Sequence, residues 1–435
     1  MKYENIDSVV KAGLCTRCGA CHGACPQMAI EWDQNYFPHT MAHCDKCGIC
    51  IAVCGGIGLN YPFFSKEYFG ESQDLVSEAI GPVRLTLAAC TTNNQIREMS
   101  SSGGLATQIP LSLMASKEID GSVTTGFEAE NLLAPTAKIA KSPEDILWGV
   151  QSKYVLFPVA HIYREIVSTP GRYLVVGLPC QIHSLIKWKK INSTLRERIF
   201  LTVGLCCHTN FGIQMLRDLL AVEKVDTNQV KKMEFRGGTW PGAFRVTLKN
   251  GSVKALHSGS EKDNALIYLQ SLYTTDRCLL CPDYAADFAD ISVSDPWIRN
   301  EYGDYMFEGG WSIANVRTER GEKVIDALVA RGDLVTKSVD RDLLLKSIES
   351  IKKDKKRGFF IRIDRRRRRG LPVPEFGLEA PRLSRKDYMT EAKFQVTLLA
   401  GRWRFIQLVL MRLFFSRFGE KLKELRTKAK NHKHH

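Results

Sequence analysis

The stretches CTRCGACHGACP, residues 15–26, and CDKCGICIAVCG, residues 44–55, are two copies of one cysteine pattern. The first copy has the spacing C-x2-C-x2-C-x3-C-P, and the second has Gly55 in place of Pro26. Three thiolates at this spacing can bind one face of a four-iron, four-sulfur cubane, while the fourth cysteine of the run reaches a second cluster. The repeat therefore predicts a module of the bacterial ferredoxin type, with two [4Fe–4S] clusters, over residues 1–62.

The spacing also predicts which cysteines share a cluster. Because the last cysteine of each run binds the other cluster, the two ligand sets are crossed. The first set is Cys15, Cys18, Cys21 and Cys54, and the second set is Cys44, Cys47, Cys50 and Cys25. Structural zinc is the alternative, but zinc usually takes two well-separated C-x2-C pairs. Iron is therefore favoured over zinc and over disulfides.

The composition of the whole chain is that of a globular protein. Of its 435 residues, 44% are hydrophobic and 25% are charged, which excludes wholesale disorder. The chain opens without a basic start followed by a long apolar stretch, so no secretory signal is expected. A cytoplasmic, reducing environment follows, in which neighbouring cysteines usually bind metals or take part in catalysis. Because no run of 18 uncharged apolar residues occurs, no membrane-spanning helix is expected.

The net charge of +14 is concentrated near one end of the chain. Residues 352–435 contain 25 Lys and Arg against 8 Asp and Glu, which leaves the rest close to neutral. A nucleic-acid-binding protein should carry its positive charge on the folded body, so no nucleic-acid partner is expected. The segment 393–430 has helical spacing and lies in a predicted basic amphipathic tail, residues 377–435. This helix would dock on a partner or on anionic lipid at the inner face of the membrane; packing on the protein's own core or dimer interface is an equal alternative.

Short apolar, β-branched runs alternate with helical stretches from Arg84 onward. The runs predict strands within residues 84–91, 121–127, 172–180, 198–207 and 289–295. Helices are expected between them, as in residues 104–118 and 181–190. This alternation predicts an α+β fold with a mixed sheet covered by helices. Residues 63–83 are a predicted linker, and residues 231–256 predict two strands closed by Asn250-Gly251.

More cysteines lie at the ends of these predicted elements. They are Cys180, the adjacent pair Cys206 and Cys207, and the C-x2-C pair Cys278 and Cys281. Spacing alone leaves open a metal site, a redox-active pair or small buried hydrophobic residues. The aspartates that follow are expected in a solvated loop rather than in a hard-metal site; they are Asp283, Asp287, Asp290 and Asp295.

Seven stretches spread over residues 84–374 and just beyond carry a family resemblance. They are SSSGGLATQI (100–109), EIDGSV (118–123), QSKYVLFP (151–158), GLPCQIHSL (177–185), GLCCHTNFG (204–212), CLLCPDYAADFADISVSD (278–295) and RGLPVPEF (369–376). In these stretches the chain resembles the family of coenzyme F420 hydrogenase/dehydrogenase beta subunits, several members of which also carry an amino-terminal two-cluster module. The resemblance implies a family N-terminal domain over residues 84–165 and a C-terminal domain over residues 166–376, which together bind a flavin and a cluster.

The resemblance also implies a third [4Fe–4S] cluster beside a bound FAD. Its ligands would be the third set, Cys180, Cys207, Cys278 and Cys281. Cys207 is preferred because Asn210 and Phe211 follow it at the family spacing, although the choice between Cys206 and Cys207 stays open. The implied flavin contacts are Ser102, Gly103, Gly104, Ser152, Lys153 and Tyr154. Small residues before a helix let backbone N–H groups approach a phosphate, and a lysine could offset negative charge on reduced flavin.

Iron–sulfur clusters exchange single electrons, whereas a flavin can accept electrons singly and donate them in pairs. We therefore predict an enzyme, an iron–sulfur flavoprotein oxidoreductase that passes electrons between ferredoxin or another redox protein and a small two-electron substrate, with coenzyme F420 as a candidate. One alternative is a reductase of a polysaccharide-related or other metabolite that does not use F420. Another is a non-catalytic electron-relay subunit of a larger complex. No catalytic acid is predicted, and His183 and His208 are expected to be structural.

Overall fold

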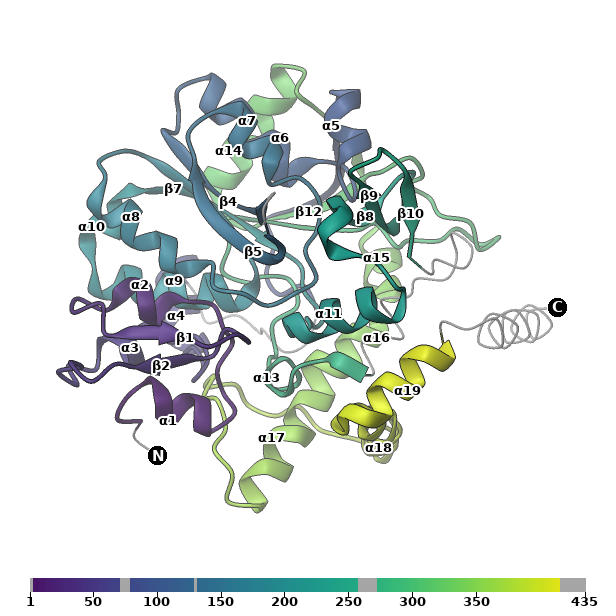
Figure 1. Ribbon diagram of the computed structural model, residues 1–435. Coiled ribbons are helices and arrows are strands. Elements are labelled where there is room, and N and C mark those ends of the chain that lie inside the picture. The colour runs from purple at the N-terminus through teal and green to yellow at the C-terminus, as the bar shows by residue number, and fades with distance from the viewer. Residues whose placement is uncertain (1–2, 71–78, 129–130, 257–271, 415–435) are drawn as a thin grey trace.

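Eight strands form the central sheet of the computed structural model, which describes residues 3–70, 79–128, 131–256 and 272–414 (Figure 1). Their order is β13-β3-β12-β11-β7-β6-β4-β5. The strands are β3 (Leu85–Thr91), β4 (Gly121–Glu128), β5 (Asn131–Ala140), β6 (Tyr173–Gly177), β7 (Ile199–Leu205), β11 (Ile291–Ser294), β12 (Ser312–Val316) and β13 (Leu334–Ser338). The four neighbours β11, β7, β6 and β4 are parallel, and the outer pairings are antiparallel. The predicted mixed sheet is confirmed.

The parallel centre of the sheet brings four strand ends to one edge. Carboxyl ends of parallel strands face the same way, and this edge is where open α/β sheets usually bind ligands. β6 leads directly to Cys180, β7 leads to Cys206 and Cys207, and β11 leads to Asp295. The topology thus places cysteines from separate parts of the chain at one edge.

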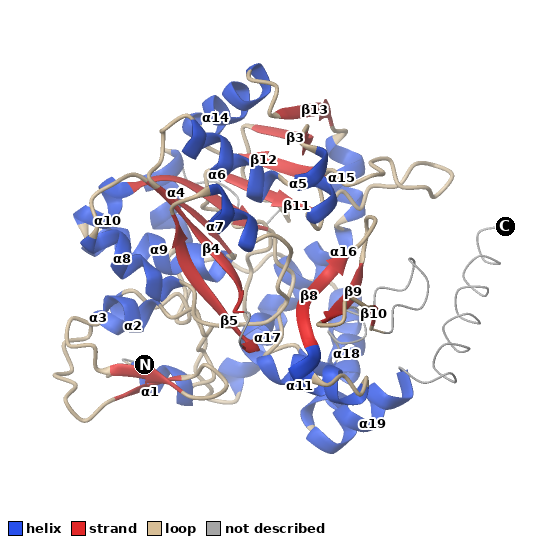
Figure 2. Ribbon diagram, turned by 45° about the horizontal axis from the view of Figure 1, so that its top comes forward, coloured by secondary structure: helices blue, strands red, loops and turns tan. Residues whose placement is uncertain are grey.

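Helices cover both faces of the sheet (Figure 2). Successive side chains of a strand point to opposite faces, so Leu174 of β6 packs in one core and Val175 in another. The Leu174 core includes α6 (Leu105–Ala115) and α14 (Glu319–Ala330). Around the sheet lie further short helices, namely α5 (Asn94–Met99), α7 (Pro143–Trp148), η1 (Ala160–Ile162), α8 (Tyr163–Ser168), α9 (Pro179–Ile191), α10 (Ser193–Arg198), α11 (Ile213–Val222), η2 (Thr227–Gln229) and α13 (Asp276–Leu279).

The amino-terminal module repeats its backbone geometry as it repeats its sequence. Arg17 and Lys46 both have left-handed φ angles, of 57° and 58°. Gly19 and Gly48 follow them two residues later, at 85° and 79°, and each begins a short helix. The elements of the module are α1 (Ile6–Lys11), α2 (Ala20–Ala24), β1 (Ile30–Trp32), β2 (Pro38–Thr40) and α3 (Ile49–Ala52). The segment predicted as a linker begins with a helix, α4 (Tyr61–Phe69), whose Tyr61 is fully buried.

A small second sheet contains the predicted hairpin, but it has three strands rather than two. Its order is β10-β9-β8, with β8 (Val230–Gly237), β9 (Ala243–Leu248) and β10 (Val253–Ala255). The Asn250-Gly251 turn joins β9 to β10, while residues 238–242 form a second turn between β8 and β9. The sequence-based prediction missed this second turn.

The basic carboxyl-terminal part is not a separate tail in the described residues. Lys355, Lys356 and Arg362 are at most 5% exposed, so part of the positive charge is buried in the body. Met411 packs in the same core as Val175 of β6. Arg404 Nη2 donates to Asp218 Oδ1 on α11 at 2.6 Å. The helices are α15 (Arg341–Ser347), α16 (Glu349–Lys352), the π-helix η3 (Lys353–Gly358), α17 (Phe359–Arg368), α18 (Arg385–Leu399), η4 (Ala400–Arg402) and α19 (Arg404–Phe414).

The predicted long helix over residues 393–430 is broken between α18 and α19, and residues 415–430 of it lie outside the described part. The expectation of a separate helix is therefore wrong for the portion that the structure describes, because α19 packs against α11. In residues 3–414, apart from the undescribed gaps, no helix has the length and apolar character needed to cross a bilayer.

Candidate functional site

Four cysteines from three elements meet at the carboxyl edge of the sheet. Cys180 lies in the first turn of α9, Cys207 follows β7, and Cys278 and Cys281 lie in and just after α13. Burial raises the pKa of the Cys180 thiol well above its usual value, and the neighbouring thiols of Cys18, Cys207, Cys278 and Cys281 raise it further. The structure thus brings the predicted third set together, with Cys18 of the amino-terminal module beside it.

Cys206 and Cys207 face different surroundings, as adjacent residues at a strand end should. Burial raises the pKa of Cys207, the cation of Lys355 lowers it, and the thiols of Cys278 and Cys281 raise it. Burial also raises the pKa of Cys206, to about 12, but the charged group that acts most strongly on its thiol is Arg317, which lowers the pKa. Cys207, and not Cys206, therefore lies among the thiols of the third set.

The predicted first set is also grouped. Burial raises the pKa of Cys21, and the thiols of Cys18, Cys15 and Cys54 add to the rise. Burial and the thiols of Cys54 and Cys18 raise the pKa of Cys15 to about 12. Several buried thiols in one place cannot all ionise unless cations compensate them. A thiolate-bound metal cluster supplies that compensation, so the donor set fits a cluster better than it fits free thiols.

The predicted second set is more open to solvent. Burial raises the pKa of Cys50 to about 11, with Cys54 and Cys44 nearby, and Cys47 is exposed. Cys25 accepts a hydrogen bond at Sγ from the backbone N–H of Ala29 at 3.3 Å.

Nowhere in the described part of the chain do three His, Cys, Asp or Glu side chains converge on one metal ion. A four-iron cluster does not need such convergence on one ion, because each of its thiolates binds a different iron atom.

Helix α9 connects the first and third sets. Cys180 lies in its first turn, and one turn later Ser184 places its Oγ 3.3 Å from Cys18 Sγ. The same hydroxyl donates to the carbonyl of Cys180 at 3.1 Å and accepts from the N–H of Gly55 at 3.1 Å. A further turn along, Lys187 Nζ donates to the carbonyl oxygen of Cys54 at 2.6 Å. The amino-terminal module is thus fixed against the helix that carries a third-set cysteine.

We expect Ser184→Ala to loosen this junction. The change leaves the buried N–H of Gly55 without its acceptor, which should cost about 1–3 kcal/mol. The midpoint of anaerobic thermal unfolding should therefore fall by a few degrees. Ser193→Ala is the control, since Ser193 is exposed just after the same helix and should leave the midpoint unchanged. Equal midpoints for both variants would contradict this role of Ser184.

Two cations, the buried Lys355 and the partly buried Arg17, lie beside the third set. Burial alone would lower the pKa of Lys355, but the thiols of Cys281, Cys207 and Cys278 raise it, so the ammonium lies beside these sulfurs. Arg17 lies between the first and third sets, because Cys15 and Cys278 both act on its guanidinium. These cations can offset negative charge on thiolates. No spacing in the sequence indicated either residue.

The expectation of solvated aspartates is wrong for Asp283 and Asp287, which are completely buried. His183 Nε2 lies 2.9 Å from Asp283 Oδ2, and Lys356 Nζ lies 3.3 Å from Asp287 Oδ2. Burial raises the pKa of Asp287, and the adjacent Asp283 raises it further. Paired charges from distant elements replace water around these carboxylates. His183, which also contacts the hydroxyl of Tyr61 at 3.2 Å, is thus held between two buried partners.

The two stretches with implied flavin contacts lie side by side. The backbone N–H of Ser152 donates to Ser101 Oγ at 3.0 Å, and Ser102 Oγ donates to the carbonyl of Trp311. The N–H of Gly103 donates to Ser312 Oγ at 3.0 Å. Gly104 begins α6 with a φ of 79°, a conformation that favours glycine. Hydrogen bonds within the chain therefore already use some of the groups predicted for the flavin.

Lys153 and Tyr154 differ in their surroundings. Burial lowers the pKa of Lys153 to about 7, and its Nζ donates to three carbonyls, those of Gly149, Val150 and Gln151, at 2.5 to 3.0 Å. Tyr154 lies beside the guanidinium of Arg236, whose pKa it helps to raise. Tyr154 therefore approaches a charged side chain of another element, Arg236 of β8.

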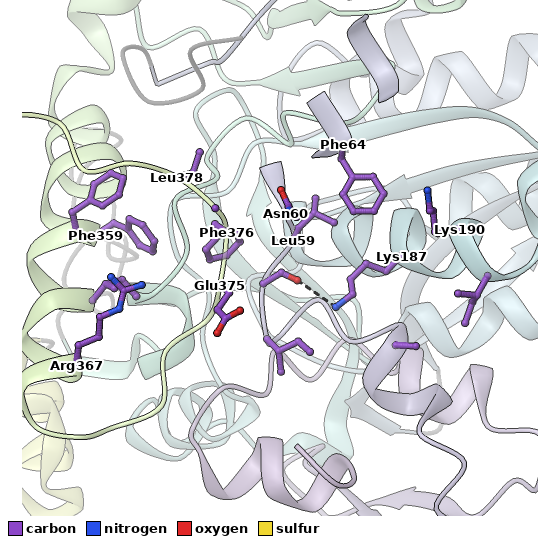
Figure 3. A pocket seen from close by; sticks show the side chains of 17 residues that line it. Leu59, Asn60, Phe64, Lys187, Lys190, Phe359, Arg367, Glu375, Phe376 and Leu378 are labelled. Carbon is purple, nitrogen blue, oxygen red and sulfur yellow. Dashed lines mark hydrogen bonds between the residues drawn. The ribbon is translucent and has the colours of Figure 1, made fainter. Parts of the chain in front are cut away.

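A cavity of about 630 Å³ lies where the amino-terminal module, α9 and the segment after α17 meet (Figure 3). The backbone of Glu375 bonds that of Ile57 at 2.8 Å, so this segment crosses the module. Phenylalanine rings line part of the cavity, and Lys187, Lys190 and Arg367 add positive charge. The residues with implied flavin contacts do not line it.

Comparison with known families accounts for most of the chain. Two halves of the family described as "Coenzyme F420 hydrogenase/dehydrogenase, beta subunit" match, the amino-terminal half at residues 86–164 and the carboxyl-terminal half at residues 171–342. The chain belongs to this family. Residues 9–31 match the "4Fe-4S binding domain", which identifies the amino-terminal part of this family member as an iron–sulfur module. The predicted resemblance is confirmed.

Relatives of this family member include oxidoreductases and their subunits. In Methanosarcina mazei, the F subunit of the F(420)H(2) dehydrogenase is 29% identical over 74% of the chain and 84% of that protein. The coenzyme F420-dependent sulfite reductase of Methanocaldococcus jannaschii is 23% identical over 84% of the chain, which spans 53% of that protein. A chain of the F420-reducing [NiFe] hydrogenase complex of Methanosarcina barkeri has the same fold, with a TM-score of 0.54 and 24% identity over 70% of this chain and 98% of that chain.

Proposed function

We propose that the chain is an iron–sulfur flavoprotein oxidoreductase that carries electrons between ferredoxin, or another redox protein, and a two-electron acceptor. The observation that carries this proposal is the contact between the first and third cysteine sets, where Ser184 bridges Cys18 and the carbonyl of Cys180. When bound, [4Fe–4S] clusters exchange single electrons, and FAD can collect two of them for transfer to a substrate.

In this proposal, the residues of the chain hold the redox groups close together and exclude water from them. The first set would hold one cluster and the third set another, with the second set nearer the surface. Arg17 and Lys355 would offset the negative charge of the thiolates. The implied flavin contacts, Ser102, Gly103, Gly104, Ser152, Lys153 and Tyr154, would hold FAD, and Tyr154 approaches the carboxyl edge of the sheet through Arg236.

Coenzyme F420 is the acceptor or donor that we propose first. The support is that the relatives in Methanosarcina mazei and Methanocaldococcus jannaschii are both described by their use of F420. A reductase of a polysaccharide-related or other metabolite would use the same chemistry with a different substrate.

A non-catalytic relay subunit is the second candidate. Two observations favour it. Gly103 and Lys153 already bond within the chain. The aromatic side chains of Trp403, just before α19, and Phe405, in α19, are 57% and 77% exposed. Exposed aromatic side chains are typical of docking surfaces.

Cofactor analysis separates these candidates. We expect anaerobically purified protein to contain about one FAD per chain, and the flavin absorbance to bleach when reduced coenzyme F420 is added. FAD that responds only to reduced ferredoxin would favour another substrate. Protein that contains iron and sulfide but no flavin, and that binds none when it is added, would contradict the flavoprotein proposal and favour the relay.

A further inference from the structure

A buried ion pair marks the carboxyl end of β11. Arg236 of β8 is 4% exposed, and its Nη1 lies 2.5 Å from Asp295 Oδ2, directly after β11. The Nε of the same guanidinium donates to the carbonyl of Pro241 at 2.8 Å. The ion pair therefore joins the small sheet to the central sheet and holds both side chains in place.

Three aromatic rings surround this pair. Trp297 lies under the guanidinium, with 5.5 Å from Arg236 Cζ to the ring centroid. The ring of Trp240 lies 5.2 Å from that of Trp297 at an angle of 30°, and Tyr305 packs edge-on to Trp240 at 5.1 Å. All three rings are only partly buried. We call Arg236, Trp240, Asp295, Trp297 and Tyr305 the aromatic–ion patch.

Polar atoms in this patch lack partners. Arg236 Nη2, Trp240 Nε1 and Asp295 Oδ1 are buried and have no hydrogen-bond partner of good geometry among the described residues, although the Tyr154 hydroxyl interacts with the Arg236 guanidinium. Buried polar groups are normally satisfied, so an unpaired group indicates a missing partner or a functional role. The three atoms comprise two donors and one acceptor beside planar rings. A ligand that satisfied all three atoms would offer two acceptors and one donor, and a planar ligand could pack beside the rings.

We propose that the aromatic–ion patch recognises the imide edge of a flavin-type ring. The pyrimidine edge of isoalloxazine presents a carbonyl, an N–H and a second carbonyl in sequence. In this assignment the two carbonyls accept from Arg236 and Trp240, the N3–H donates to Asp295, and Trp297 stacks on the ring. FAD and a deazaflavin coenzyme share this edge, whereas nicotinamide does not. The inference rests on the proposed function and adds the residues that would select the ring.

The position of the patch agrees with this assignment. β11 and β7 are adjacent and parallel, so Asp295 and the Cys206–Cys207 pair lie at the same edge of the sheet. The hydroxyl of Tyr284 lies near Asp295 and also near Cys207, so it links the patch to a member of the third set. Tyr154, from the implied flavin stretch, lies beside Arg236 and packs on Phe235, with their ring centroids 5.8 Å apart. A ring held by the patch would therefore lie near both regions.

The test is calorimetric binding to the full chain, purified anaerobically with its clusters and freed of flavin. The ligands are lumiflavin, 8-hydroxy-5-deazaflavin and the N3-methyl form of each, since the methyl group removes only the N3–H donor. We expect N3-methylation to weaken binding of the recognised ring about 10-fold or more. If N3-methylation weakens the binding of lumiflavin, the recognised ring is that of FAD. If it weakens the binding of the deazaflavin, the recognised ring is that of the substrate.

Two variants test whether the patch causes this dependence of the affinity on the N3–H. Asp295→Asn should weaken binding of the recognised parent ring about 10-fold or more and should abolish the discrimination against its N3-methyl form. Trp240→Phe keeps a ring but removes Nε1, and should weaken binding about 5-fold or more. Tyr388→Phe is the control, because it also removes one polar hydrogen from an aromatic side chain, and Tyr388 is 48% exposed on α18. This variant should bind each ring as the unchanged protein does.

Two results would overturn the inference. If N3-methylation changed neither affinity, the patch would not read the imide edge, although the flavoprotein proposal would stand if FAD still bound. If Asp295→Asn and Trp240→Phe both bound every ring as the unchanged protein does, the ring would lie elsewhere. Failure of the unchanged protein to bind any of these rings would overturn the flavoprotein proposal and this inference together.

Discussion

Cys207→Ser is expected to remove about four iron atoms per chain, whereas Cys206→Ser should leave the iron content unchanged. The thiol of Cys207 lies among Cys278, Cys281 and Lys355. The thiol of Cys206 faces Arg317 and Ser294 instead. Serine has nearly the same volume as cysteine but is a poor ligand for iron in place of a thiolate. A difference in iron content between the two serine variants therefore reports loss of an iron ligand rather than a change in packing.

The comparison needs anaerobic purification of both variants beside the unchanged protein. Iron and acid-labile sulfide are counted per chain, and the reduced clusters are followed by electron paramagnetic resonance. Cys206→Ser is the matched control, because it makes the same chemical change one residue away after the same strand. Equal iron loss in both variants, or loss only in Cys206→Ser, would show that the assigned ligand is wrong.

Lys355→Met is expected to make the reduction potential of the cluster on the third set more negative. The buried ammonium acts on the thiols of Cys281, Cys207 and Cys278, so it favours the reduced, more negative state. Removing one charge at this range, with an effective dielectric constant near 20, should shift the potential by on the order of 100 mV. Methionine keeps the long unbranched stem, so packing changes little.

A redox titration monitored by electron paramagnetic resonance measures this shift. The control is Lys353→Met on the same π-helix, because Lys353 is about half exposed and pairs with Glu349 at 3.5 Å. Water screens such a charge, so the control should move the potential little. A shift of the same size in both variants would mean that Lys355 acts through general charge rather than through its place beside the thiols.

Local spacing made the amino-terminal module predictable. Cys15, Cys18 and Cys21 are close in sequence, so the short loop between them must bring their thiols near one another. The strands that end at Cys180 and Cys207 were predictable because apolar, β-branched runs stop there. The meeting of these strand ends follows from parallel pairing, which the alternation of strands and helices indicated.

Contacts between distant segments were not predictable from the sequence. Asp283 and Asp287 look like solvated carboxylates until Lys356 and Arg317 are seen beside them. Lys355 belongs to a run that is basic in composition, and only the packed π-helix shows that it faces the thiols. Composition counts charges but does not say which of them a fold buries.

We propose that the first and third sets each hold a [4Fe–4S] cluster and that the second set holds another. The most direct test is the count of iron and acid-labile sulfide per chain in anaerobically purified, unchanged protein. Three occupied sets predict about twelve iron and about twelve sulfide per chain. A stable value near eight iron atoms per chain, or zinc in place of iron on these cysteines, would contradict the assignment of three [4Fe–4S] clusters.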